Sequence, residues 1–248
     1  MRRDGRPVPR LFVDCPLGQD LSATLADSQR HYVARVMRLG QGDAVRLFNG
    51  RDGEWLAVFD GAGALCREAL KPQPSGEGPW LMFAPPKRDR LRFLVEKATE
   101  LGVGRLIPVT TERTEPPGAK PEKMREWAIE AAEQCGRCDV PACLEQRPLT
   151  AVLADWPVGR DLLLCDETGS GKPLVATDTA CCGFLVGPEG GFSSRELEML
   201  RARREVVPVS LGSYILRVET ACLAALATWH LRSTGASVTH EPGGAPTS

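Results

Sequence analysis

The chain has 248 residues, of which 42% are hydrophobic and 25% charged, and its formal net charge is −1 at pH 7. These proportions are typical of a globular protein, and no apolar run approaches the roughly 20 residues that a membrane-spanning helix needs. Residues 1–16 are basic but lack the apolar stretch and cleavage site of an export signal. We therefore expect a soluble protein of the cytoplasm.

Residues 10–70 predict a small β-rich module. Residues 10–13, 44–50 and 54–60 are rich in β-prone side chains and are separated by glycine-containing turns. The next segment, KPQPSGEGP at 71–79, contains three prolines and two glycines, a composition typical of a linker. We expect a first domain at 1–71, a linker at 72–79 and a second domain at 80–234.

The second domain alternates short apolar runs with helical patterns. Helices are expected at 89–102 and 121–135, because apolar residues recur there every three or four positions. A last helix is expected from Arg217 onward, where the sequence is rich in alanine and other small residues. The face expected to be buried in the second helix comprises Met124, Trp127, Ala128, Ala131 and Cys135. Strands are expected at 80–86, 105–109, 161–165, 183–187 and 204–210. Such short continuous runs favour a parallel sheet covered on both faces, an α/β fold, followed by a disordered tail at 235–248.

The stretch LVGPEGGFSSRE, residues 185–196, places glycines between a strand and a helix. Ser193 with Glu196 predicts a capping box, and Phe192 with Leu197 predicts a hydrophobic staple, so a helix should begin there. The glycines can form either a tight turn or a ligand site. The dinucleotide pattern G-x-G-x-x-G is absent, and Glu189 would repel a pyrophosphate. A ligand with adenine and ribose but no phosphate suits this turn better.

A second glycine turn occurs in VSLGSYILRVETA, residues 209–221. Its Arg217 and Glu219 could be an ordinary solvated pair at a helix start. Two glycine turns at two strand ends can nevertheless form one pocket, because open α/β sheets bind ligands outside the carboxyl ends of their strands. The stretch TGSGKP at 168–173 is similar to a phosphate-binding loop, but Asp166 and Pro173 break that motif, and we expect a surface turn.

Nine cysteines and two basic stretches remain to be interpreted. The number of cysteines is odd, and we expect reduced thiols. Cys135 and Cys138 have CxxC spacing, but there is no second ligand pair, so we expect no metal. Residues 1–51 contain nine arginines against five aspartates, and residues 87–125 contain ten Lys or Arg against six acids. This charge fits either a nucleic-acid surface or an ordinary solvated surface.

Five blocks together resemble one family of enzymes. They are HYVARVMRLGQGDAVRLFNG (31–50), KATELGVGRLIPVTTERT (97–114), EAAEQCGRCDVP (130–141), LVGPEGGFSSRE and LGSYILRVETA. In this order they are similar to the ribosomal RNA small subunit methyltransferase E family of the SPOUT superfamily. The resemblance implies an N-terminal PUA-like β-barrel for RNA binding and a C-terminal SPOUT α/β domain with a deep trefoil knot at about 185–221. It also implies a homodimer.

The resemblance further implies S-adenosylmethionine as the cofactor, held by both glycine turns. The positions that it assigns to cofactor binding are Leu185, Val186, Gly187, Pro188, Glu189, Gly190, Gly191, Ser210, Leu211, Gly212, Ile215, Leu216, Thr220 and Ala221. One position departs from the family pattern: Ser213-Tyr214 stands where the family typically has Pro-Arg. A cationic group of the family is therefore missing at Tyr214.

The activity implied is methylation of N3 of a uridine in the decoding region of 16S rRNA in the small ribosomal subunit. Uridine N3 becomes nucleophilic only after losing its proton, so we expect Arg217 to stabilise the negative charge that develops on the base. We expect Glu219 to orient Arg217 or to assist removal of the proton. N3 lies on the Watson–Crick edge, so the base must be unpaired. The positions expected to contact RNA are Arg10, Arg30, Arg35, Arg38, Lys87, Arg88, Arg90, Arg92 and Arg113. Two alternatives are a knotted methyltransferase of other position specificity and an RNA-binding assembly factor without catalysis.

Overall fold

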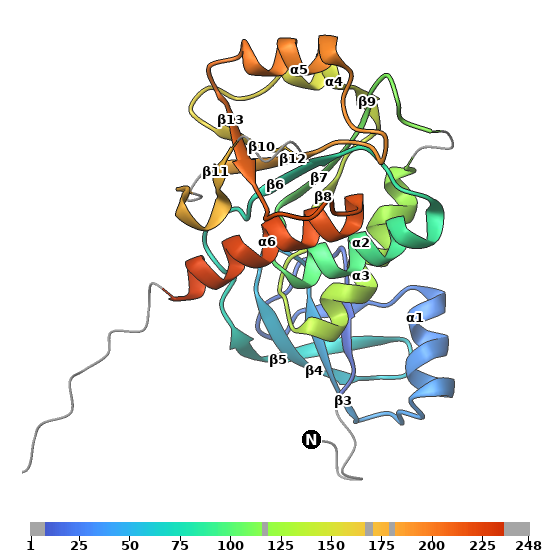
Figure 1. The fold of residues 1–248 in the computed structure, drawn as a ribbon. Coiled ribbons are helices and arrows are strands. Elements are labelled where there is room, and N and C mark those ends of the chain that lie inside the picture. Colours follow the sequence, from blue (N-terminus) through green and yellow to red (C-terminus); the bar gives the residue numbers. More distant parts are fainter. Residues whose placement is uncertain (1–7, 116–118, 167–170, 179–181, 236–248) are drawn as a thin grey trace, which may run out of the picture. The chain divides into compact units, whose positions relative to one another are not determined.

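The computed structural model describes residues 8–115, 119–166, 171–178 and 182–235, and its chain divides into two compact units (Figure 1). The first unit consists of residues 1–77 and 122–143, and the second of residues 78–121 and 144–248. No helix in the described ranges is long and apolar enough to cross a membrane. Residues 236–248 of the tail expected at 235–248 lie outside the described residues, as do residues 168–170 of the glycine-rich stretch 168–173.

The first unit contains a sheet with the strand order β1-β3-β4-β5-β2. Its strands are β1 (Arg10–Phe12), β2 (Ser22–Thr24), β3 (Ala44–Phe48), β4 (Glu54–Phe59) and β5 (Gly63–Lys71). β1 pairs with β3 in parallel and the other pairs are antiparallel. Register shifts within the β4–β5 pair disrupt its ladder in two places, a feature that bends strands. The sheet therefore curves around its apolar face in the manner of a half-barrel.

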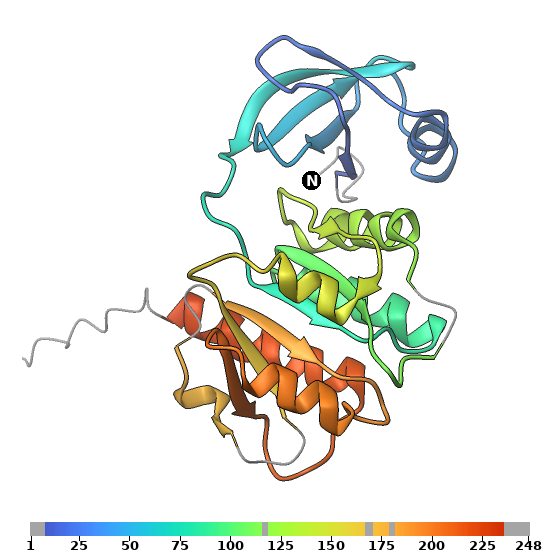
Figure 2. The same cartoon turned by 90° about the horizontal axis from the view of Figure 1, so that it is seen from above.

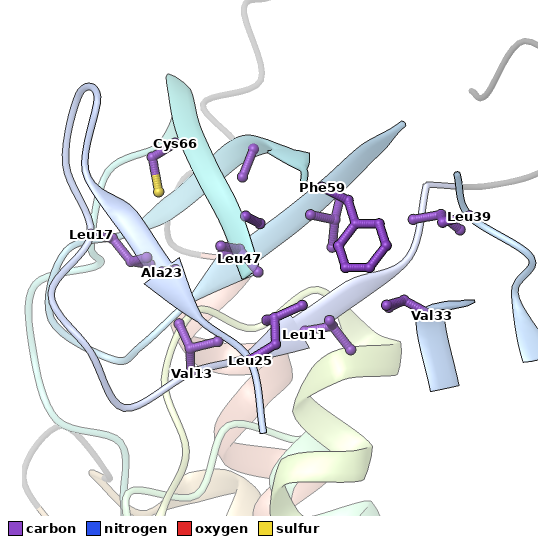
Figure 3. Close-up of a cluster of buried hydrophobic side chains, with 13 residues drawn as sticks. Leu11, Val13, Leu17, Ala23, Leu25, Val33, Leu39, Leu47, Phe59 and Cys66 are labelled. Atoms are coloured by element: carbon purple, nitrogen blue, oxygen red, sulfur yellow. The ribbon is translucent and has the colours of Figure 1, made fainter. Parts of the chain in front are cut away.

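Inward-facing apolar side chains of this sheet form the core of the first unit (Figure 3). Leu11, Leu47 and Phe59 come from three strands, and Leu25 and Val33 come from the segment after β2. That segment contains the short helix α1 (Asp27–His31) and a π-helical turn (Tyr32–Val36), which the sequence analysis did not predict. Five residues are too few to show a helical period, so the apolar pattern could not reveal this helix.

Helix α3 (Pro121–Cys135) and the short strand β8 (Ala142–Cys143) lie far along the sequence, yet residues 122–143 belong to the first unit. Ala132 packs in one cluster with Phe12 and Phe48. The backbone N–H of Phe12 donates to Glu133 Oε1 over 2.9 Å. These contacts differ from the expected division, which put the segment in the second domain.

The bounds expected for α3 are those observed. Met124, Trp127, Ala128 and Ala131 are buried as expected, but Cys135 is exposed. The last turn of a helix often departs from regular α-helical geometry, so the 3.6-residue period predicts burial less well there.

The second unit contains a parallel sheet with the strand order β11-β13-β10-β12-β6-β7, and β9 pairs with β7. Its strands are β6 (Trp80–Phe83), β7 (Arg105–Thr110), β9 (Arg147–Pro148), β10 (Asp161–Cys165), β11 (Lys172–Pro173), β12 (Cys182–Val186) and β13 (Val206–Ser210). β12 is buried along its whole length. Continuous burial is expected of a parallel strand that is covered on both faces.

Helices cover both faces of this sheet (Figures 1 and 2). They are α2 (Arg88–Glu100), α4 (Leu149–Ala154), α5 (Ser194–Arg201) and α6 (Val218–Gly235), with a 3₁₀ turn at Leu174–Ala176. α4 and α5 lie on one face, and α2 and α6 lie side by side on the other. Five of the strands and three of the helices, α2, α5 and α6, were expected from the sequence within a few residues. The six-residue α4 and the two-residue strands are too short to give a periodic signal.

Candidate cofactor site

A pocket in the second unit lies where β10, β12 and β13 end. The carboxyl ends of parallel strands lie at one edge of a sheet, and ligands of open α/β sheets bind outside that edge. The pocket is lined by Leu164, Cys165, Asp166, Val186, Gly187, Pro188, Glu189, Gly191, Phe192, Leu197, Leu211, Gly212, Tyr214, Ile215, Leu216, Val218 and Ala221. Both glycine turns thus contribute to one cavity.

The first turn, residues 187–191, needs glycine at two positions for different reasons. Gly191 has φ +69°, a left-handed backbone conformation that residues other than glycine rarely adopt. A Cβ on Gly187 would come within 2.7 Å of the Phe192 ring, so this glycine permits close packing of the ring. Arg113 donates from Nη1 to the carbonyl of Gly190 over 2.6 Å. The turn is therefore held from outside as well as by its own backbone.

The helix after this turn begins as the sequence predicts. Ser193 is the N-cap: its hydroxyl accepts the Glu196 N–H, and the Glu196 carboxylate accepts the Ser193 N–H over 2.9 Å. The other carboxylate oxygen of Glu196 accepts the N–H of Glu112 over 2.9 Å. Phe192 and Leu197 both pack against the same core cluster. This cap determines where α5 begins and hence the direction in which the glycine turn leaves β12.

The second loop follows β13. Gly212 has φ +127°, and its N–H meets the hydroxyl of Ser210 at 3.3 Å. Tyr214 and Ile215 line the pocket, yet these residues are 85% and 80% exposed. The rim of the pocket therefore presents one aromatic and one aliphatic side chain to solvent.

Arg217 and Glu219 lie at the start of α6 but do not line the pocket. Arg217 is exposed. The Glu219 side chain is 12% exposed, and its Oε1 lies 3.7 Å from Nε of Arg90. Its Oε2 is buried and has no hydrogen-bond partner within the described part of the chain. The cation beside Glu219 is therefore Arg90, whereas the sequence analysis expected Arg217.

Most of the positions expected to bind the cofactor meet at this pocket. Those that line it are Val186, Gly187, Pro188, Glu189, Gly191, Leu211, Gly212, Ile215, Leu216 and Ala221. Four expected positions do not line it: Leu185, Gly190, Ser210 and Thr220. Leu185 belongs to the buried core, because alternate side chains of β12 point to opposite faces of the sheet.

Asp166 lines the pocket but was not among the positions expected to bind the cofactor. It directly follows β10, and its side chain is 2% exposed. Its Oδ2 lies 3.0 Å from Nη2 of Arg201, and its N–H donates to the carbonyl of Val209. The sequence did contain a signal for Asp166, because this residue directly follows a continuous apolar strand. Ligands of open α/β sheets bind where strands end, and the end of β10 lies beside the two glycine turns.

The residues expected to contact RNA lie in different environments. Arg35, Arg38, Lys87 and Arg88 are exposed. Arg30 and Arg92 form ion pairs with Asp27 and Glu96 on their own helices, and Arg113 holds the glycine turn. Arg90 forms ion pairs with Glu189 and Glu219.

Arg10, which was expected to contact RNA, is instead bonded inside the first unit. Its side chain is only 8% exposed and pairs with the fully buried Glu54, and its other nitrogens donate to the carbonyls of Ala132 and Arg137. Each of its three side-chain nitrogens thus donates inside the first unit, so Arg10 is a structural residue there.

The CxxC residues differ in their surroundings. Cys135 is exposed, whereas Cys138 is buried beside Arg10, and burial raises the pKa of the Cys138 thiol. Within the described ranges, no three His, Cys, Asp or Glu residues are grouped so that they could hold a metal ion.

The lining fits a nucleoside-type cofactor without phosphate. Two turns with glycine at left-handed positions expose backbone groups, and apolar side chains from both loops suit a flat heterocycle. The buried carboxylate of Asp166 can accept hydrogen bonds from hydroxyl or ammonium groups. Glu189 also lines the cavity and would disfavour an anionic phosphate.

Comparison with known proteins agrees with this interpretation. Residues 77–230 match the family described as RNA methyltransferase domain, and residues 25–64 match the RNA methyltransferase PUA domain. The ribosomal RNA small subunit methyltransferase E of Rickettsia conorii is 32% identical over 231 residues, which are 88% of this chain and 93% of the relative. Its counterpart in Bacillus subtilis is 29% identical over 82% of this chain and 87% of the relative.

Solved structures show the same likeness. The ribosomal RNA small subunit methyltransferase E of Neisseria gonorrhoeae, bound to S-adenosyl methionine, superposes with a TM-score of 0.81 at 27% identity, over 92% of this chain and 98% of that one. A putative methyltransferase of Legionella pneumophila in complex with the same cofactor has a TM-score of 0.74 at 26% identity, over 92% and 98%. The chain belongs to the ribosomal RNA small subunit methyltransferase E family.

Proposed function

We propose that this protein transfers the methyl group of S-adenosylmethionine to N3 of one uridine in the decoding region of 16S rRNA, in the cytoplasm. The observation that carries the proposal is the pocket formed by the two glycine turns, in a chain whose relatives of similar fold bind this cofactor. The proposed substrate follows the names of the family's curated relatives, which act on RNA of the small subunit.

The turn at 187–191 and the loop at 211–216 would hold the cofactor through backbone groups and apolar contacts, with Asp166 as a hydrogen-bond acceptor. When bound, S-adenosylmethionine supplies an electrophilic methyl group on a sulfonium. The protein must then orient the uridine and favour its anion, because only the deprotonated N3 attacks a carbon centre. A new N3–methyl bond forms as the sulfur–methyl bond breaks, which leaves S-adenosylhomocysteine.

Arg217 is the exposed cation at the mouth of α6, and in our proposal it stabilises the negative charge of the uridine anion. Glu219 accepts the N3 proton, directly or through water, at its unpartnered Oε2. If Arg217→Ala methylates normally in a single turnover with saturating RNA, Arg217 has only a structural role. Arg204→Ala is a matched control, because Arg204 lies just before β13 and outside the pocket.

The exposed basic residues would contact RNA phosphates: Arg35 and Arg38 in the first unit, and Lys87 and Arg88 in the second. Such contacts make affinity strongly dependent on salt. The double charge reversal Arg35→Glu with Arg38→Glu should therefore weaken RNA binding at low salt. Unchanged affinity would exclude the first unit from RNA binding.

We further propose a homodimer and a trefoil knot over about 185–221, as the family resemblance implies. Light scattering on the purified protein would give a mass of about twice 26.9 kDa if the dimer is correct. A monomer mass at the concentration used for catalysis would contradict it.

Mass mapping of 16S rRNA tests the activity. RNA from a deletion strain should lack one methyl group on one decoding-region uridine, and the wild-type gene should restore it, whereas the gene for Arg217→Ala should not. A missing methyl at another nucleotide would assign a different position specificity. Calorimetric titration with S-adenosylmethionine distinguishes a non-catalytic assembly factor, which should show no binding.

A further inference from the structure

Arg90 connects the glycine turn of the cofactor pocket with the first turn of α6. Its Nη1 is hydrogen-bonded to Oε1 of Glu189, and its Nε lies 3.7 Å from Oε1 of Glu219. Glu189 belongs to the glycine turn after β12, and Glu219 belongs to the first turn of α6. A single guanidinium from α2 therefore pairs with a carboxylate on each of two segments that are 30 positions apart in the sequence.

The environment of Arg90 differs from that of its neighbours on α2. Its side chain is 33% exposed and is used by two acids, whereas Arg88 is exposed and Arg92 pairs with Glu96 on the same helix. An arginine that grips RNA phosphates must offer its donors to solvent. Arg90 instead pairs with Glu189, which lines the pocket, and with Glu219, so it contacts other parts of the second unit.

The pairing also determines which oxygen of Glu219 is available. Oε1 faces Arg90, and the buried Oε2 has no hydrogen-bond partner among the described residues. A buried carboxylate oxygen without a donor is costly, and such a group in a native fold is usually completed by a ligand or by water. The ion pair at 3.7 Å favours the orientation of the carboxylate in which Oε1 is the oxygen nearer to Arg90.

We propose that Arg90 is a positioning residue: it holds Glu189 of the cofactor turn and Glu219 together and keeps Oε2 of Glu219 available as the acceptor for the substrate's proton. The inference rests on the proposed function for the role of that acceptor. It reassigns Arg90 from RNA binding to assembly of the site. Without Arg90 the two carboxylates would face each other without a cation between them and would move apart.

A double-mutant cycle tests this role. Arg90→Gln should lower the single-turnover rate with saturating RNA and cofactor by roughly tenfold to a hundredfold, the usual cost of misplacing a reacting group. The variant pair Arg90→Gln with Glu219→Gln should be no slower than Glu219→Gln alone, because Arg90 acts through Glu219. Additive losses would overturn the proposal.

Two further measurements separate positioning from other roles. RNA affinity at low salt should be unchanged in Arg90→Gln, and a loss there with a normal rate at saturating RNA would make Arg90 an RNA contact. Arg90→Lys keeps the charge but not the fork, so it should recover part of the rate. Lys97→Gln, which removes an exposed ion pair with Glu100 on the same helix, is the matched control and should behave as wild type.

Cofactor affinity keeps the test independent of the substrate. Because Glu189 lines the pocket, Arg90→Gln and Glu189→Gln should each weaken S-adenosylmethionine binding, and their effects should not add. If wild-type enzyme binds the cofactor but methylates no uridine, the proposed function fails while this coupling can still be measured. If Arg90→Gln does not fold, Glu189→Gln and Arg90→Lys carry the same comparison. Unaltered S-adenosylmethionine affinity in both Arg90→Gln and Glu189→Gln would overturn the proposed coupling between Arg90 and the glycine turn.

Discussion

Glu54 and Arg10 form an ion pair inside the first unit, with Oε2 of Glu54 3.0 Å from Nε of Arg10 and side chains that are 0% and 8% exposed. Arg46 and Lys71 also lie within 3.5 and 3.8 Å of the Glu54 carboxylate. The Arg10 guanidinium lies 3.8 Å from the centre of the Phe48 ring. Through Arg10 the first strand is joined to the carbonyl of Ala132 on α3.

Removal of the Glu54 charge should therefore destabilise the protein strongly. Glu54→Gln removes the carboxylate that pairs with buried Arg10, and the breaking of such a pair typically costs about 3–5 kcal/mol. Urea unfolding of the full chain would measure this loss. Arg67→Gln, which removes an exposed pair with Asp20, should cost less than about 1 kcal/mol. Equal effects of the two changes would contradict a special role for the buried pair.

Gly187→Ala should weaken cofactor binding. The new Cβ would lie within 2.7 Å of the Phe192 ring, which must then move and displace the turn. We expect a loss of S-adenosylmethionine affinity of about tenfold, or roughly 1.4 kcal/mol, by calorimetry. Gly40→Ala is a control, because its Cβ would meet only Asp43 at 3.9 Å. Wild-type affinity in Gly187→Ala would show that the ring can adjust without moving the turn.

Tyr214→Ala should reduce RNA binding without reducing stability. The residue is 85% exposed at the pocket rim, so it contributes little packing, but an exposed aromatic ring can stack on a base. Such stacking is worth about 1–3 kcal/mol per base. Titration of labelled RNA would measure the loss, and thermal unfolding would verify the fold. Val175→Ala, another exposed apolar position, should leave RNA affinity unchanged.

Tyr214→Arg introduces the group that the family typically has at this position. If the rim contributes charge rather than stacking, this variant should bind RNA more tightly than wild type, with a steeper salt dependence. If stacking dominates, it should bind less tightly. RNA titrations at two salt concentrations distinguish these results.

Glu133→Gln should stabilise the protein at neutral pH but not at acidic pH. Burial raises the pKa of Glu133, so the folded state favours its protonated form, and ionisation opposes folding as the pH rises through this range. Glutamine carries no charge and still offers an oxygen to the Phe12 N–H. We expect a melting temperature higher by about 2 °C at pH 7, with the difference vanishing below the ordinary pKa of glutamate. A difference that grows on acidification would reverse the sign of the argument.

The elements with strong local signals were the ones that the sequence predicted well. In helix α3 apolar residues recur every three or four positions and form one face, and the bounds of the helix are those expected. The start of α5 follows from Ser193 and Glu196, which bond to each other's backbone and need no distant partner. The short helix α1 and strand β2 offered no comparable pattern, since α1 has five residues and buries none of them, and β2 has three residues that pair with β5.

The sequence by itself therefore determined the α/β pattern and the two glycine turns, because these depend on neighbours within one or two helical turns. The positions assigned to cofactor binding were implied by the family resemblance. Only the tertiary structure decided which charges meet. Arg10 and Arg90 belong to basic stretches, and their composition is equally compatible with an RNA surface. Folding instead places Arg10 beside Glu54 and Arg90 between Glu189 and Glu219. The role of an arginine depends on the carboxylates within a few ångströms, and chain topology brings those from segments that lie far apart in the sequence.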